Sequence, residues 1–290
     1  MGDGVTAVKL PKRAPARPPA IVESRPPLAA GSAASPHTPP LPPVASSAAA
    51  RLSVIIPVYN ERNTLRELLE RVRAQPLTWQ DRPVELEVVV VDDCSNDGGV
   101  DFLERPESRA GFPEVRLIRH QRNRGKGAAI RTGLFYATGN VVLIQDADLE
   151  YDPADYPHLL APILEGRTRV VYGSRFLGRP PLSRLPGMHP ANWLANKLLS
   201  WTASALFARR VTDEATCYKV MDRALIDELA LRAERFDICP EITSKVLRRG
   251  YRIVEVPIVY RGRGGNEGKK IRWTDAFHAW FTLLRYRLSN

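Results

Sequence analysis

The stretch Val141-Val142-Leu143-Ile144-Gln145-Asp146-Ala147-Asp148 leads from a run of apolar residues into two carboxylates. A short, uninterrupted apolar run is typical of a strand that is buried on both faces of a sheet. Asp146 and Asp148 then follow the carboxyl end of that strand, which is where α/β sheets bind their ligands. Paired carboxylates suit Mg²⁺ or Mn²⁺, which also take substrate phosphates as ligands. By itself such a pair is more typical of a solvated loop, so the surrounding chain decides its meaning.

The segments before this stretch repeat an order of strand, polar loop and helix. Apolar runs predict strands over 52–57, 86–91, 115–119 and 141–145. Apolar residues at helical spacing predict intervening helices over 64–74 and 128–137. Strands that alternate with helices imply an α/β fold, with a mostly parallel sheet covered by helices on both faces. Polar loops at 57–61, 92–98 and 146–150 would then share one edge of the sheet.

The remaining chain is less regular and more helical. Short apolar runs predict strands over 170–172 and 252–260. Amphipathic spacing predicts helices over 155–164, 192–208, 223–231, 241–249 and 273–287. We therefore expect a helical C-terminal part after the regular α/β portion.

The first fifty residues differ in composition from the rest, since Pro and Ala supply 11 and 12 of them. Such a segment cannot bury enough apolar surface to offset its ordering entropy, so we expect 1–50 to be a disordered tail. Prolines interrupt every apolar run that could serve as a signal peptide. The expected organisation is this tail, a catalytic domain over 51–262, and a basic loop with an amphipathic helix over 263–290.

Composition limits the compartment and the partners. The three cysteines have neither a zinc-site spacing nor an even number, which indicates a reducing, cytoplasmic setting. No run approaches the roughly twenty apolar residues that a transmembrane helix needs, so we expect a soluble or peripheral protein. The formal charge of +10 favours phosphate-rich partners, namely nucleotide diphosphates, anionic lipids or nucleic acid.

Four ordered motifs at the expected strand ends make the chain resemble the family 2 glycosyltransferases, which have a Rossmann-like GT-A fold. They are Val54-Ile55-Ile56-Pro57-Val58-Tyr59-Asn60-Glu61, Val90-Val91-Asp92-Asp93-Cys94-Ser95-Asn96-Asp97-Gly98, Asn123-Arg124-Gly125-Lys126-Gly127 and Asp146-Ala147-Asp148. Two further segments, Leu149-Glu150-Tyr151-Asp152-Pro153 and Gly173-Ser174-Arg175, are similar to the polyprenyl-phosphate mannose and glucose synthases. The resemblance covers residues 52 to about 262 and is strongest up to Arg175.

The resemblance implies a nucleotide-sugar site and assigns residues to it. The base pocket would be lined by Pro57, Tyr59 and Glu61. Base and ribose would be bound by Asp92 and Asp93, and the diphosphate by Arg124 and Lys126. The metal, Mg²⁺ or Mn²⁺, would be held by Asp146, Asp148 and Glu150. Many relatives carry Gln at the third position, so Glu150 departs from the commoner pattern.

Two acceptors remain open at this point. A polyprenyl phosphate is already ionised near neutral pH and needs a cation rather than a base, and Arg175 is the candidate for that cation. A sugar hydroxyl of a polysaccharide or glycolipid needs a base, for which Asp213 or Glu214 is the candidate, although Asp213 could equally have a structural role. Asp148, Arg175 and Asp213 are thus the expected catalytic residues. The leading hypothesis is an inverting hexosyltransferase that uses GDP-mannose or UDP-glucose and a polyprenyl phosphate at the cytosolic membrane face.

Two other questions concern partners. Trp273, Phe277, Trp280, Phe281 and Leu284 recur at helical spacing beside arginines, which suits either an interfacial helix on anionic lipid or a helix packed on the core. A membrane surface or a membrane-protein partner is therefore possible. A noncatalytic nucleotide- or nucleic-acid-binding module would also fit the pI of about 9.8. Basic residues alternate with acidic ones, however, and no aromatic RNA-binding motif occurs, so we expect no nucleic acid.

Overall fold

The structure is a computed structural model that describes residues 50–180, 183–185, 187–262 and 273–288 of the chain. The predicted tail, apart from Ala50, and the basic loop at 263–272 lie outside the described residues. Ala50 is buried and leads directly into the first strand.

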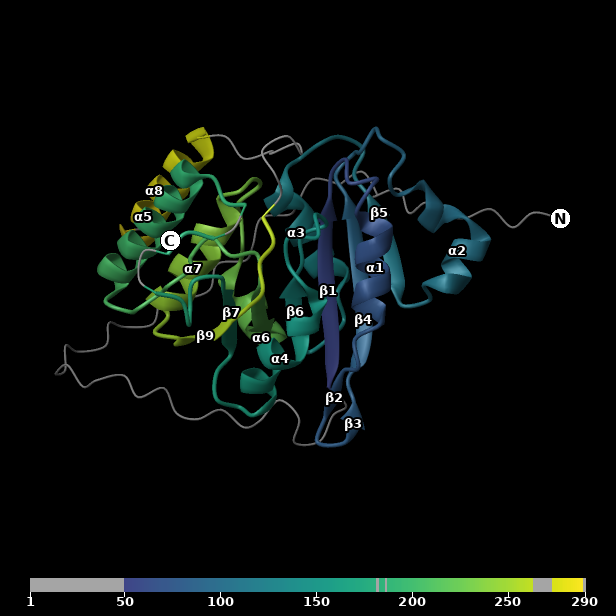
Figure 1. Cartoon of the computed structure of the whole chain (residues 1–290), viewed down its shortest axis with the longest axis horizontal. Helices are drawn as coiled ribbons and strands as arrows, with labels where there is room; N and C mark the ends of the chain where they lie inside the picture. The colour runs from purple at the N-terminus through teal and green to yellow at the C-terminus, as the bar shows by residue number, and fades with distance from the viewer. Residues whose placement is uncertain (1–49, 181–182, 186, 263–272, 289–290) are drawn as a thin grey trace, which may run out of the picture.

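A seven-stranded sheet forms the centre of the molecule (Figure 1). Its order is β5-β4-β1-β6-β8-β7-β9. The pairs β5/β4, β4/β1, β1/β6 and β7/β9 are parallel, while β8 runs antiparallel to both of its neighbours. The expected α/β class with a mostly parallel sheet is confirmed. The strands are β1 (Arg51–Val58), β4 (Glu85–Asp92), β5 (Val115–Arg119), β6 (Val141–Ile144), β7 (Val170–Ser174), β8 (Lys219–Asp222) and β9 (Ile253–Pro257).

The helices agree with the predicted ones to within a few residues. They are α1 (Leu65–Arg73), α3 (Lys126–Tyr136), α4 (Tyr156–Leu164), α5 (Pro190–Phe207), α6 (Arg223–Leu229), α7 (Ile238–Arg248) and α8 (Trp273–Leu288). Helix α3 packs on β1 and β4, and α4 packs on β7. Helices α5 and α8 contact each other beyond the β9 side of the sheet, at the left of Figure 1. Among the described helices, none is long and apolar enough to cross a bilayer.

Strand β8 is not predicted by the sequence pattern, because its apolar residues are confined to Val220 and Met221 and it begins with a lysine. Lys219 is nevertheless fully buried. Its Nζ donates to the carbonyl oxygens of Glu214, at 2.7 Å, and Thr216, at 2.9 Å. The backbone of the preceding loop therefore solvates the charge. The other elements without a sequence prediction are β2 (Thr78–Trp79), β3 (Arg82–Pro83), α2 (Pro106–Gly111) and two 3₁₀ turns, Asp101–Glu104 and Pro153–Asp155.

One buried carboxylate joins three segments at the end of the sheet opposite the predicted site. Glu87 of β4 accepts hydrogen bonds from the Ser53 hydroxyl and from the backbone N–H and the hydroxyl of Thr138, the latter two at 2.8 and 3.0 Å. Burial alone would raise the pKa of Glu87, but these hydrogen bonds outweigh it and hold the pKa below its ordinary value. The ionised carboxylate therefore ties β1 and β4 to the turn before β6.

Candidate active site

The loops that follow β1 and β4 are fastened to each other by hydrogen bonds. Asn60 adopts a left-handed conformation, with φ of 52°, which asparagine tolerates better than most residues. Its backbone N–H donates to Ser95 Oγ, and its side-chain oxygen accepts from the Asn96 N–H, both at 2.9 Å. The Arg62 N–H donates to Asp97 Oδ2 at 2.9 Å. The two loops therefore form one rigid rim at the carboxyl edge of the sheet.

The three predicted base-pocket residues lie between the end of β1 and the start of α1. Pro57 is half-buried within β1, and Tyr59 is exposed at the rim. Glu61 is anchored at the start of α1, where its carboxylate accepts from the Thr64 hydroxyl at 3.1 Å. The structure thus brings all three to the edge of the sheet where the sequence predicts the nucleotide.

Asp92 ends β4 and is almost completely buried. Its Oδ1 accepts from the Ser95 N–H at 2.9 Å, and its Oδ2 lies 3.4 Å from Arg119 Nε. The carboxylate shapes the turn that follows β4 and also carries an ion pair with β5.

Asp93 is directed into the protein rather than toward an open site. Its two oxygens accept from the backbone N–H groups of Arg124, at 2.9 Å, and Gly125, at 2.7 Å. His120, which the sequence reading missed, places Nδ1 2.7 Å from Asp93 Oδ1 and Nε2 2.9 Å from the Thr132 hydroxyl. The structure therefore gives Asp93 the task of holding the predicted diphosphate loop. The position of His120 directly after the β5 strand is the signal that could have identified it.

The loop before α3 is held against a second backbone segment. Gly125 has φ of +95°, and a Cβ there would lie 2.5 Å from the carbonyl oxygen of Glu234. A Cβ on Gly127 would lie 2.6 Å from the carbonyl oxygen of Ala233. Both glycines are therefore required by close backbone approach. They fix the direction in which Lys126 leaves the loop.

Lys126 and Asp146 form an ion pair, with 2.6 Å between Nζ and Oδ1. Burial alone would lower the pKa of Lys126, but the charge and hydrogen bond of Asp146 outweigh burial and raise it well above its ordinary value. Burial has the opposite effect on an acid and raises the pKa of the Cys217 thiol. This side chain is therefore a packed thiol and not a thiolate nucleophile. The structure thus places a fixed positive charge against one of the two carboxylates after β6.

The carboxylate pair fits a divalent cation that the substrate helps to bind. Asp146 and Asp148 flank the buried Ala147, and both are partly exposed. In the part of the chain that the structure describes, no three His, Cys, Asp or Glu side chains group to hold a metal. Mg²⁺ is commonly bound through one or two carboxylates together with substrate phosphates, so two carboxylates are sufficient.

Glu150, the predicted third ligand, is not grouped with this pair. Its Oε2 accepts from the Tyr260 hydroxyl at 2.8 Å, and its carbonyl oxygen accepts from the Arg261 N–H at 2.9 Å. The chain reverses at Leu149, where φ is 60°. This arrangement connects the carboxylate segment to the chain after β9, and the role of Glu150 as a metal ligand stays a prediction.

Arg175, which follows β7, forms a buried bidentate ion pair with Asp213. Its Nε and Nη2 each donate to one Asp213 oxygen at 2.7 Å, and its backbone N–H donates to the same carboxylate at 2.9 Å. Asp213 is fully buried. Burial alone would lower the pKa of Arg175, but Asp213 raises it, so the guanidinium stays charged. This geometry favours the structural role of Asp213, because a base needs access to the proton that it removes.

Aromatic rings surround the guanidinium of Arg175. Its Cζ lies 5.2 Å from the ring centroid of Tyr260, 5.7 Å from that of Phe176 and 6.0 Å from that of Tyr151. Burial and the Glu150 carboxylate raise the pKa of Tyr260, which therefore remains a hydrogen-bond donor. Tyr260, to which the sequence analysis assigns no role, connects Arg175 to Glu150 and so to the segment that carries Asp148.

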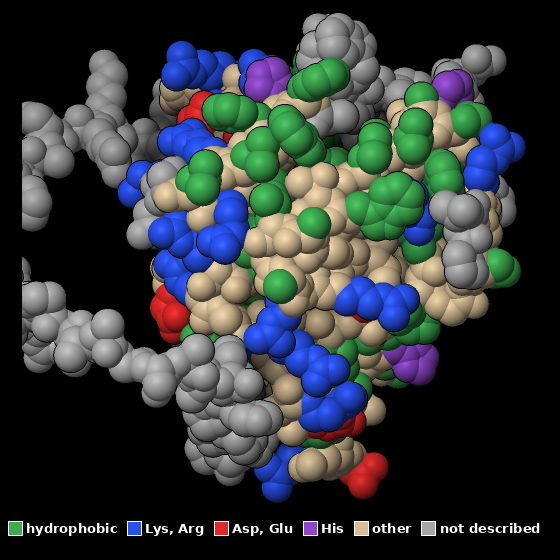
Figure 2. All heavy atoms as spheres, turned by 90° about the vertical axis from the view of Figure 1, so that its left-hand side faces the viewer, with side chains coloured by type: hydrophobic (Ala, Val, Ile, Leu, Met, Phe, Trp, Pro, Cys, Tyr) green, Lys and Arg blue, Asp and Glu red, His purple; other side chains and the backbone are tan. Residues whose placement is uncertain are grey.

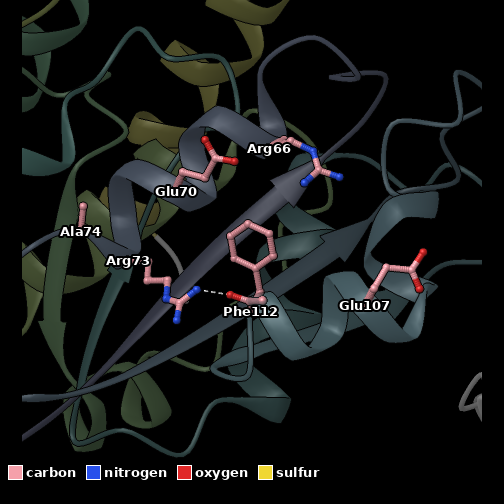
Figure 3. A pocket seen from close by; sticks show the side chains of 7 residues that line it. Arg66, Glu70, Arg73, Ala74, Glu107 and Phe112 are labelled. Carbon is pink, nitrogen blue, oxygen red and sulfur yellow. Dashed lines mark hydrogen bonds between the residues drawn. The ribbon is translucent and has the colours of Figure 1, made fainter.

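A depression of about 550 Å³ between α1 and α2 is separate from these residues (Figure 3). In Figure 3, Arg73 reaches across it and donates to the carbonyl oxygen of Gly111. Its lining residues are Arg66, Glu70, Arg73, Ala74, Glu107, Gly111 and Phe112. None of the predicted site residues lines this depression, so it is not the candidate nucleotide-sugar site.

The geometry of the strand-end loops agrees with a family match. The family model for "Glycosyl transferase family 2" matches residues 53–229. The chain belongs to this family. The matched range contains all four strand-end motifs together with Arg175 and Asp213, so the resemblance read from the sequence is confirmed.

The relatives of this chain include transferases named for polyprenyl phosphates. The undecaprenyl-phosphate 4-deoxy-4-formamido-L-arabinose transferase of Pseudomonas fluorescens (strain Pf0-1) is 30% identical over 220 residues, or 75% of this chain and 59% of that protein. The dolichol-phosphate mannosyltransferase of Pyrococcus furiosus is 30% identical over 228 residues, or 76% of this chain and 59% of that protein. The chain therefore spans less than two thirds of the length of each.

A solved structure of the same fold supports the architecture. Glucosyl-3-phosphoglycerate synthase of Mycobacterium tuberculosis, crystallised with Mn²⁺ and UDP-glucose, superposes with a TM-score of 0.61 at 20% identity. The match covers 83% of this chain and 80% of that one. At this identity the likeness establishes the fold alone.

Proposed function

We propose that this family 2 chain is an inverting, metal-dependent glycosyltransferase that moves a hexose from UDP-glucose or GDP-mannose to a polyprenyl phosphate at the cytosolic face of a membrane. The names of the two characterised relatives support the acceptor class, since undecaprenyl and dolichol phosphates are both polyprenyl phosphates. The binding of Mn²⁺ and UDP-glucose by a protein of the same fold supports the donor class.

The observation that carries the proposal is the connection between the Arg175 guanidinium and the carboxylate segment after β6. Arg175 is fixed by Asp213 and stacked near Tyr260, and the Tyr260 hydroxyl is bonded to Glu150. An arginine matches phosphate geometry, and a second phosphate must be held close to the donor for transfer to occur. A preorganised cation beside the donor carboxylates suits an anionic acceptor.

On the donor side, the chain would bind the nucleotide at the rim formed by the loops after β1 and β4. Pro57, Tyr59 and Glu61 would meet the base, and Asp92 the ribose. Asp93 would act indirectly, through the Arg124–Gly125 backbone that it holds. Arg124 and Lys126 would then face the diphosphate, where positive charge stabilises the leaving group.

Asp146 and Asp148 would hold Mg²⁺ or Mn²⁺, which when bound supplies Lewis-acid stabilisation of the leaving diphosphate. The charge of Lys126 beside Asp146 would serve the same diphosphate. An Asp146 released from Lys126 as the donor binds would have its full charge available to the metal.

In the transfer step, an oxygen of the acceptor phosphate attacks the anomeric carbon of the hexose. The bond from that carbon to the diphosphate oxygen breaks, and its electron pair leaves with the nucleoside diphosphate. Attack from the face opposite the leaving group inverts the anomeric centre. No proton needs to be removed, because the acceptor phosphate is ionised near neutral pH. Arg175 would position that phosphate.

Transfer to a sugar hydroxyl is the alternative, and the site supports it less well. It requires a base, and the candidate Asp213 is fully buried with both oxygens bonded to Arg175. A carboxylate in a bidentate ion pair accepts a proton reluctantly, because protonation would leave the guanidinium unpaired.

The test is a transfer assay with purified full-length protein, Mn²⁺ and each nucleotide sugar in turn. Three acceptors are compared: a short polyprenyl phosphate, the matching polyprenol, and an oligosaccharide. Of the three acceptors, we expect only the polyprenyl phosphate to give product, and we expect EDTA to abolish turnover. Two results would refute the proposal. One is product from the oligosaccharide without product from the polyprenyl phosphate, and the other is the absence of product with every combination of donor and acceptor.

A further inference from the structure

Helix α5 exposes an apolar stripe along its outer face. Leu194, Leu198 and Trp201 are each about half exposed, at 48, 49 and 55%, and Ala205 continues the same face. These positions follow the spacing of i, i+4, i+7 and i+11, so they line one side of the helix. Large apolar side chains are seldom left in water in such a row.

Helix α8 adds a second stripe beside the first. Phe277, Trp280 and Phe281 are exposed by 66, 46 and 63%. Trp280 Nε1 donates to the hydroxyl of Thr202 on α5 at 3.2 Å, which fixes the two helices side by side. A small separate core between them is formed by Leu199, Ala203, Leu206, Ala279 and Leu283. The exposed stripes therefore belong to one packed surface, which we call the α5–α8 face.

The described charged side chains that flank the α5–α8 face are basic, and the one acidic residue in the sequences of these two helices is Asp275, in the first turn of α8. Arg209 and Arg210 are exposed just beyond α5, and Arg285 and Arg287 are exposed in the last turn of α8. The sequence of α5 contains no acidic residue. In Figure 2, hydrophobic side chains gather on the upper part of this side of the molecule, basic ones lie around them, and acidic ones lie toward the edges. Aromatic residues bordered by arginines complement the acyl boundary and anionic headgroups of a bilayer.

The same helix reaches the acceptor side of the candidate site with a residue at one border of this stripe. Lys197 Nζ lies 3.6 Å from the ring centroid of Phe176, the residue that follows Arg175. Burial lowers the pKa of Lys197 and outweighs the opposing pull of the nearby Asp213. Helix α5 thus carries an exposed apolar stripe and, at the border of that stripe, a cation near the Arg175–Asp213 pair.

We infer that the α5–α8 face docks on the surface of an anionic lipid bilayer. Trp201, Trp280 and Phe281 enter the headgroup and acyl boundary, and the flanking arginines meet lipid phosphates. The purpose of this docking, to present Arg175 to a lipid-linked acceptor, rests on the proposed function. The docking itself does not, because it needs only the lipid surface.

The test is flotation of full-length protein with vesicles that contain no polyprenyl phosphate. One set contains phosphatidylglycerol and phosphatidylcholine in equal parts, and the other contains phosphatidylcholine alone. We expect binding to the anionic vesicles, weaker binding to the neutral ones, and weakening by high salt. The combined variant Trp201→Ser, Phe281→Ser should bind about tenfold more weakly.

The matched control is Phe135→Ser, which removes an exposed aromatic from α3, away from the α5–α8 face; its side chain is 77% exposed. This control should bind vesicles as the wild-type chain does. Unchanged binding by the combined variant would overturn the inference. The inference would also be overturned if the wild-type chain fails to float with vesicles and instead forms a dimer that the combined variant does not form. A second copy of the chain would then cover the α5–α8 face. Transfer to a detergent-dispersed acceptor is measured separately, so a failure of docking and a failure of the proposed activity give different results.

Discussion

The donor half and the acceptor half of the candidate site are built in different ways. On the donor side, the loops after the parallel strands β1, β4, β5 and β6 supply the residues, and Asp146 and Lys126 keep 22 and 17% of their side chains exposed. On the acceptor side, Arg175 and Asp213 come from segments 38 residues apart and keep only 6 and 0% exposed. A change to a partly exposed carboxylate on the donor side should therefore alter chemistry and spare folding. A change on the acceptor side should alter both, because an unpaired buried charge is costly.

The largest effect is expected from Asp148→Asn on the donor side. Loss of one carboxylate should lower kcat by roughly 10³-fold, as for other groups that stabilise developing charge. The melting temperature should stay close to that of the wild-type chain, because the side chain is partly exposed. Asp81→Asn, in the β2–β3 turn where φ is 62°, is a matched control, and Asn tolerates that conformation. Steady-state kinetics measure kcat for both variants, and thermal unfolding measures their melting temperatures. Unchanged turnover in Asp148→Asn would show that Asp148 is not part of the active site.

Asp213→Asn should behave in the opposite way. It leaves the Arg175 guanidinium buried with a weakened partner, so the free energy of unfolding should fall by about 3 kcal/mol. Denaturant unfolding measures this loss. In the fraction that remains folded, the pH dependence of turnover should keep the wild-type shape. A variant of wild-type stability without any turnover would instead identify Asp213 as a catalytic base and favour a hydroxyl acceptor.

Gly127→Ala tests whether the donor loop is positioned by backbone contact. The added methyl group would lie 2.6 Å from the Ala233 carbonyl oxygen, so the loop that carries Lys126 must shift. We expect a loss of about 1–3 kcal/mol in stability, as for other overpacked positions. Gly111→Ala, where an added Cβ meets nothing within 4 Å, should be neutral. Calorimetric titration with UDP and GDP should show weaker nucleotide binding for Gly127→Ala and unchanged binding for Gly111→Ala.

Glu87→Gln tests a buried carboxylate outside both halves. Its pKa is lower in the folded chain than its ordinary value of 4.5, so ionisation stabilises the fold above that pH. This contribution is lost as the pH falls through the lower pKa of the folded state. The variant should lose about 1 kcal/mol at neutral pH and show a shallower loss in acid. Urea unfolding over a series of pH values measures both; parallel curves for the two proteins would contradict the assignment.

The same contrast explains how much the sequence could predict. Strands β1, β4 and β6 contain continuous apolar runs, and the polar residues after them share one edge, so the edge that carries the donor residues could be predicted by position, while the role of each residue came from the family resemblance. The roles of Asp93 and His120 could not be predicted in this way. They depend on which backbone N–H groups the Asp93 carboxylate contacts in the folded chain.

The acceptor half was less predictable for a physical reason. Strand β8 begins with Lys219, whose buried charge is solvated by carbonyl oxygens that no sequence pattern indicates. Tyr260 and Glu150 meet across 110 residues. Arg175 and Asp213 were identified individually through the family resemblance, but their direct pairing emerged only from the fold.

The most direct test of the account is the acceptor kinetics of Arg175→Lys. Lysine keeps the positive charge but loses the planar guanidinium, whose Nε and Nη2 pair with Asp213 and whose Nη1 would receive a phosphate oxygen. At saturating nucleotide sugar, we predict that the KM for polyprenyl phosphate rises by about tenfold or more, while the KM for the donor changes by less than about twofold. An equal rise in both, or an unchanged acceptor KM, would contradict the claim that Arg175 holds the acceptor phosphate.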